Sequence, residues 1–211
     1  MRSPANLKLI DLYNYLKSVW VPVIATILLT SLSSCNSDYT PKPKGYFKIP
    51  FPTKAYQQFN EPGYPYSFEY PVYAKVLKDS SFFNEATENP WWINIDFPQF
   101  NGKVHVSYKQ IGTNQFDKLV NDAFTMTNKH NVKAYSIDDS LITTPNNVHG
   151  LFFKVGGNVA TANQFFLTDS TRHFLRGALY FDAAPNEDSL GIVNRFLLDD
   201  VRHMINTFKW K

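Results

Sequence analysis

Apolar and polar residues alternate in several segments of the chain, the pattern of β-strands with one buried face. The clearest pair of segments is 92–100 and 103–111. Asn101-Gly102 lies between them, and this dipeptide favours a type I′ hairpin turn with both residues at positive φ. The sequence therefore predicts an antiparallel hairpin here.

Further segments carry the same signal. It begins at 66–70 and is weak at 73–77. After a helical stretch, the pattern predicts strands at 134–142, 149–156, 163–168 and 173–182. Short turns separate these strands, and short connections imply antiparallel pairing because parallel strands need long crossovers.

Two segments have helical spacing instead. In 116–127 the apolar residues recur every three or four positions, and Asn114 is a candidate N-cap. We expect this helix to end near His130. A longer amphipathic segment runs from 188 to 208, capped by Asn186 or Asp188. The predicted fold class is α+β: a single antiparallel sheet carrying two main helices, within one domain at 66–211.

The N-terminal residues have the layout of a secretory leader. Positive charges precede the apolar run 19–32, which is too short for a comfortable membrane span of roughly 17–25 residues. The run ends in Leu-Ser-Ser followed by Cys35, the only cysteine. This ending resembles a bacterial lipobox, which implies cleavage of a signal peptide at 1–34 and lipidation of Cys35. The alternative is an uncleaved anchor helix with an incidental cysteine.

The next part of the chain is rich in proline. Seven of the 13 prolines lie within 41–71, which excludes a helix or a central strand there. We expect a lipidated tether at 35–40 and an extended arm at 41–65. The arm's aromatic residues either cover the domain's own core or bind a partner. The candidate partner-binding residues are Lys44, Tyr46, Phe47, Lys48, Phe51, Trp91 and Trp92.

The tandem tryptophans suggest a second possibility. Alternate residues of a strand face opposite sides of a sheet, so only one of Trp91 and Trp92 can belong to a core. The other would be covered by the arm, lie in an interface, or stack on a sugar.

Charge excludes one class of partner. The leader carries three of the 21 Lys and Arg residues and one of the 18 Asp and Glu residues, so the remainder is nearly neutral. A nucleic-acid-binding protein would show a basic excess. We expect no nucleic-acid partner.

Catalytic signatures are missing. The sequence lacks the nucleophile elbow, the zinc-protease helix motif and both glycine-rich phosphate motifs. Its five histidines are scattered. Its acidic pairs, Asp138-Asp139, Glu187-Asp188 and Asp199-Asp200, have ordinary structural explanations: the first two lie at expected turns or a helix start, and Asp199 lies four residues before His203 on one helix face. We expect no catalytic residues, no metal and no cofactor, and predict that the protein is not an enzyme.

Several segments resemble the gliding motility lipoprotein GldD family of the Bacteroidetes. The arm, with the sequence PKPKGYFKIPFP at 41–52, is the most specific, and further matching segments are 65–71, 89–95, 149–153, 161–167 and 172–181. The resemblance implies a role in the gliding machinery, which works with the type IX secretion system, and it supplies no catalytic residues. At the level of fold, the element order also resembles a PsbP/Mog1-type α/β/α sandwich.

Together these observations predict a non-enzymatic, membrane-anchored lipoprotein that acts through contacts with other proteins of the gliding and secretion machinery. Asp38 follows Cys35 without an acidic run, which favours the periplasmic side of the cell envelope without choosing between inner and outer membranes. The alternative is a periplasmic lipoprotein that binds a glycan or another small ligand.

Overall fold

The computed structural model describes residues 15–22, 48–79, 81–82 and 85–211. The chain divides into two compact units, residues 1–45 and 46–211. In the first unit, residues 15–22 are helical. Within the described residues, none of the helices combines the length and the apolar character needed to cross a bilayer.

The second unit is built around a seven-stranded sheet in which every neighbouring pair is antiparallel. In spatial order its strands are β3 (Lys75–Lys78), β6 (Ile93–Phe97), β7 (Gly102–Gln110), β11 (His173–Phe181), β10 (Asn163–Thr168), β9 (His149–Gly157) and β8 (Ala134–Thr143). The strands expected at 134–142, 149–156, 163–168 and 173–182 are all present, within one residue of the expected bounds.

The expectation of a single sheet is wrong. A second, three-stranded antiparallel sheet consists of β1 (Tyr56–Phe59), β2 (Tyr66–Pro71) and β12 (Lys209–Trp210), and β4 (Ser81–Phe82) pairs with β5 (Glu85–Ala86). Strand β12 has only two residues, too few for a periodic signal. Strand β1 lies in the proline-rich arm, between Pro52 and Pro62, and occupies an edge of the small sheet.

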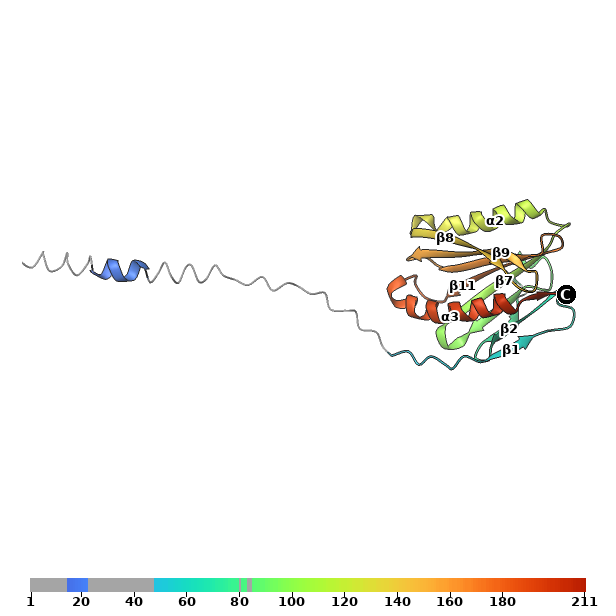
Figure 1. Ribbon diagram of the computed structural model, residues 1–211, viewed down its shortest axis with the longest axis horizontal. Helices are drawn as coiled ribbons and strands as arrows, with labels where there is room; N and C mark the ends of the chain where they lie inside the picture. Colours follow the sequence, from blue (N-terminus) through green and yellow to red (C-terminus); the bar gives the residue numbers. More distant parts are fainter. Residues whose placement is uncertain (1–14, 23–47, 80, 83–84) are drawn as a thin grey trace, which may run out of the picture. The chain divides into compact units, whose positions relative to one another are not determined.

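Two main helices pack against the seven-stranded sheet, α2 (Phe116–Asn128) and α3 (Glu187–Thr207), with the 3₁₀ helix η2 (Lys129–Val132) directly after α2. Figure 1 shows them on opposite sides of the sheet. The larger core joins α3 to one sheet face and to the small sheet, through residues such as Phe165, Leu167, Leu197, Val201 and Tyr66. The smaller core joins α2 to the other face, through Leu119, Ala123, Phe153, Phe166 and Phe174.

The β6–β7 hairpin is confirmed, but its turn differs from the prediction. The register pairs Ile93 with Val106 and Phe97 with Gly102. The 3₁₀ helix η1 (Pro98–Phe100) makes the connection and ends at Asn101, which has φ 47°. Gly102 is not among the positive-φ residues of the described chain; it begins β7. A β-carbon there would lie 3.1 Å from the Phe181 ring, so close packing explains this glycine.

The helix starts were predicted with mixed success. Asn186 caps α3, and its side-chain oxygen accepts a hydrogen bond from the Ser189 backbone N–H. At α2 the cap residue is Gln115, which makes no side-chain cap bond. Asn114 instead donates its amide to Glu88 and to the Gln110 carbonyl, because the preceding turn aims it at the end of β7.

Candidate functional site

Part of the predicted site lies outside the described residues. This holds for Cys35 and for three of the partner-binding candidates, Lys44, Tyr46 and Phe47. Lys48, Phe51, Trp91 and Trp92 are described, and each can be placed.

The last part of the arm packs against its own domain. The Phe51 ring lies 4.4 Å from the Phe196 ring on α3 and 5.7 Å from the Phe100 ring, measured between centroids. The Gln99 side-chain amide donates to the Pro50 carbonyl oxygen at 2.6 Å. Phe51 keeps 37% of its surface exposed, and Lys48 is exposed. At these positions the arm therefore covers the domain and also presents an outer surface.

A buried carboxylate on α3 lies next to the docked arm. Asp200 is 1% exposed. One of its oxygens accepts hydrogen bonds from the Lys54 ammonium at 2.8 Å and the Tyr56 hydroxyl at 3.0 Å, and the other accepts from the Tyr73 hydroxyl at 2.5 Å. Lys54 also donates to the Phe196 carbonyl oxygen at 2.6 Å. The carboxylate is thus neutralised by one cation and bonded by three donors, as a buried charge requires.

These contacts shift the two phenols. Burial, followed by the hydrogen bond to Asp200, raises the pKa of Tyr56 to about 12, and the same causes raise the pKa of Tyr73 still further. Both hydroxyls therefore stay protonated and act as hydrogen-bond donors at neutral pH. The cluster binds the arm to helix α3. The Asp200 carboxylate is buried and is therefore not accessible to a substrate.

Near this cluster, His203 has a different partner from the one that the sequence predicted. We expected it to pair with Asp199, four residues earlier on the helix. Instead its Nε2 lies 2.7 Å from a Glu69 carboxylate oxygen on β2, and its ring stacks on Tyr56 at 3.6 Å. The contact comes from the second sheet, which the sequence did not reveal.

Both tryptophan side chains form hydrogen bonds within the domain. Trp91 Nε1 donates to the Gly63 carbonyl oxygen at 2.7 Å, and Trp92 Nε1 donates to the Tyr108 carbonyl oxygen at 2.8 Å. Both side chains are half-buried against the larger core. The expectation that only one could belong to a core was wrong, because both residues precede β6 and strand alternation does not apply to them. Their described contacts favour a structural role over sugar stacking.

The histidines offer limited chemistry. His105 Nδ1 lies 3.8 Å from an Asp79 oxygen, beside a cavity of about 20 Å³, which holds about one water molecule. His173 Nδ1 lies 2.6 Å from the buried Tyr108 hydroxyl. Burial lowers the pKa of both histidines, so both are neutral at pH 7. Among the described residues, His, Cys, Asp and Glu side chains do not gather in a group that could hold a metal ion.

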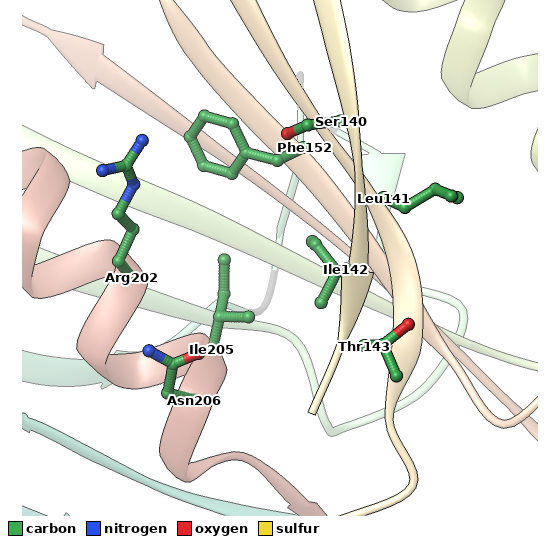
Figure 2. A pocket seen from close by; sticks show the side chains of 8 residues that line it. All are labelled: Ser140, Leu141, Ile142, Thr143, Phe152, Arg202, Ile205 and Asn206. Atoms are coloured by element: carbon green, nitrogen blue, oxygen red, sulfur yellow. The ribbon is translucent and has the colours of Figure 1, made fainter. Parts of the chain in front are cut away.

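Two pockets lie between the edge strand β8 and helix α3, and together we call them the β8–α3 groove. One part has a volume of about 350 Å³, and Figure 2 shows its lining: Ser140, Leu141, Ile142, Thr143, Phe152, Arg202, Ile205 and Asn206. A second part of about 270 Å³ lies nearer the start of α3, where Tyr135 and Asp138 of β8 face Glu187 and Arg195 of the helix. The groove therefore follows β8 along most of its length.

A known protein family matches most of the chain. Residues 36–210 match the family described as "Gliding motility lipoprotein GldD". The chain belongs to the GldD family. The match includes the arm, both larger sheets and both main helices, and it confirms the expected family membership.

Other comparisons add little to the GldD assignment. Curated proteins give no match. The chain is similar to the solution structure of cyanobacterial PsbP (CyanoP) from Synechocystis sp. PCC 6803, with 11% identity and a TM-score of 0.45, over 86% of this chain and 99% of that chain. The expected likeness to a PsbP domain is thus found, at a similarity that supports no conclusion about function.

Sequence reasoning missed two features of this GldD family member. Asp200 was set aside as one half of an acidic pair with Asp199. It lies three residues after Leu197 and four before Met204, both in the apolar stripe, and this spacing was the available signal that it faces inward. The β8–α3 groove had no signal in the sequence, because the strand order that places β8 at an edge depends on contacts distant in the chain.

Proposed function

We propose that this protein is a non-enzymatic lipoprotein, anchored to an envelope membrane through acyl chains on Cys35 and facing the periplasm. It acts in the gliding and type IX secretion machinery by contacting other proteins. The observation that carries the proposal is the family match over residues 36–210.

The leader pattern supports the anchor. A cysteine directly after a short apolar run and small residues suits lipid attachment. Each buried CH₂ group of an acyl chain contributes about 0.8 kcal/mol, and stable anchoring takes more than one chain. A lipoprotein with several chains on one residue would therefore remain at its membrane.

The described side chains support contact rather than catalysis. The buried carboxylate of Asp200 is bonded on both oxygens, and the cavity beside His105 is too small for a substrate. The open surfaces are the groove along β8 and the outer side of the arm. Surfaces of this kind suit binding to another macromolecule.

A gene deletion complemented with the wild-type chain tests the proposal. We expect the deletion to abolish colony spreading and to impair type IX secretion, and the wild-type chain to restore both. Normal spreading and secretion in the deletion strain would refute the proposal.

A further inference from the structure

Strand β8 is the longest of the strands that end a sheet in the described chain. It has ten residues, whereas β3 at the opposite edge of the same sheet has four, with a lysine at each end. The outer strands of the small sheet have four and two residues. Short edges with lysines prevent unwanted strand pairing, and a long edge leaves backbone N–H and C=O groups available to another chain.

Two large apolar side chains of β8 are exposed. Leu141 is 86% exposed and Tyr135 is 75% exposed. Leu141 pairs in register with Leu151 and lies on the α2 side of the sheet, whereas Ile142 and Phe152 face the groove beside α3 (Figure 2). An additional strand along β8 would therefore find apolar partners on both of its faces.

Charge argues against a second copy of this chain as the occupant. Asp138 and Asp139 are exposed in the middle of β8. In a two-fold antiparallel pairing centred there, the acids of one copy would lie opposite the acids of the other, which is destabilising. Asp138 has Lys154 opposite it on β9, but Asp139 has Phe153, so Asp139 carries a charge that its neighbouring strand does not balance.

We propose that β8 and the adjoining groove bind an extended basic segment of another envelope protein, which adds to the sheet as an eighth strand. The proposal rests on the contact function proposed above and names the mode of contact. Main-chain hydrogen bonds to the edge supply affinity in this mode, and side-chain pockets supply specificity.

The geometry also predicts the pattern of that segment. Its residues alternate between the two faces of the sheet. Those on one face fill the groove over Ile142, Phe152 and Ile205 and are apolar; those on the other face lie beside Asp139 and include Lys or Arg. An acidic residue on that second face would be repelled by Asp139, whereas Arg195 and Arg202 line the groove face, which takes the apolar residues.

The binding test uses the mature lipidated protein, which begins at Cys35, in detergent micelles. The probe is a short fluorescent peptide of alternating valine and lysine, with two matched peptides: one has glutamate for lysine, and the other is N-methylated on alternate residues so that it keeps its charge but cannot pair as a strand. We expect only the first to bind and to protect β8 amides from hydrogen exchange. Equal binding of the N-methylated peptide, or no binding at all, would overturn the proposal.

Matched variants locate the site. The double variant Asp138→Lys, Asp139→Lys should weaken binding of the valine–lysine peptide at least about tenfold. The double variant Glu61→Lys, Asp182→Lys makes the same change of charge at exposed positions outside β8 and its neighbouring strand, and should bind as the wild type does. Equal losses of peptide affinity in both variants would mean that binding depends only on net charge, which would overturn the proposal. Wild-type protein that dimerises through β8, with protected β8 amides in the absence of peptide, would make a second copy the occupant.

Complementation of the deletion strain separates the two proposals. If the deletion abolishes gliding and the variant Asp138→Lys, Asp139→Lys fails to restore it while the control variant succeeds, docking at β8 is supported. If both variants restore gliding, docking at β8 is wrong and the contact function stands. If the deletion itself glides normally, the contact function is wrong, whereas the peptide measurements still judge the strand-binding site.

Discussion

Lys54 and Asp200 lie 146 positions apart in the sequence and meet at 2.8 Å between ammonium and carboxylate. Lys54 lies within the arm, shortly before β1, and Asp200 lies in the last helix. The ion pair, with its two tyrosine donors, ties the start of the domain to its end. Because Asp200 is buried, the arm is part of the folded domain from this point onward.

Removing the charge of Asp200 should therefore destabilise the domain. In Asp200→Asn the Lys54 ammonium loses its counter-ion and an amide replaces one acceptor. We expect a loss of about 2–3 kcal/mol in the free energy of unfolding, below the full cost of breaking a buried pair because the Lys54 side chain is 27% exposed. Urea denaturation measures it, with Asp199→Asn, an exposed neighbour, as the control. Equal stability of the two variants would show that the pair contributes nothing.

The tyrosines of this cluster should make stability fall at alkaline pH. The pKa of Tyr56 is raised to about 12 in the folded state, above the ordinary value of 10.0. The unfolded chain therefore loses its proton first, and the stabilisation that is complete below pH 10 is lost as the pH rises from about 10 to about 12. Tyr56→Phe should show a shallower decline in unfolding free energy over that range. An unchanged slope would contradict the burial of this hydroxyl beside Asp200.

A substitution at Gly102 tests why a glycine follows the hairpin turn. Because its β-carbon would lie 3.1 Å from the Phe181 ring and 3.5 Å from Leu197, we expect Gly102→Ala to destabilise the domain by about 1–3 kcal/mol. Combining it with Phe181→Ala should recover part of that loss. Asn101→Gly should be tolerated, since Asn101 holds the positive φ. A cost at Gly102 that Phe181→Ala leaves unchanged would point to backbone strain instead.

Gly102 shows which kinds of feature the sequence could predict and which it could not. Local alternation and helical spacing located β6, β7, the four later strands and both helices, because each signal is contained within its own segment. The small sheet was missed because Lys209 and Trp210 acquire strand geometry only by pairing with Ser67 and Tyr66, far away in the chain. The β8 groove was missed for the same reason, because edge position depends on contacts that no local pattern records, whereas the helical spacing of Asp200 was a local signal that was not used.

Phe51 tests whether the arm has a role beyond covering the domain. Its ring packs on Phe196 and Phe100 but remains 37% exposed, so Phe51→Ala should cost about 1–2 kcal/mol, less than a fully buried phenylalanine. Lys48→Ala, at an exposed position, should leave the melting temperature unchanged. If cells carrying the stable Lys48→Ala variant lose gliding, the arm's outer surface binds a partner. If they glide normally, Lys48 does not belong to an interface.

Cys35→Ser tests the membrane anchor. The hydroxyl cannot accept the thioether-linked acyl group that a lipobox implies, so the variant should keep its leader and lack the acyl mass increment in mass spectrometry. A version with its own leader replaced by a cleavable secretory signal, which releases the same domain without lipid, is the matched control. We expect it to leave the membrane fraction, because about 0.8 kcal/mol per acyl CH₂ is lost with the chains. If the wild-type protein instead starts at Met1 with an unmodified thiol, the anchor and its location are both wrong.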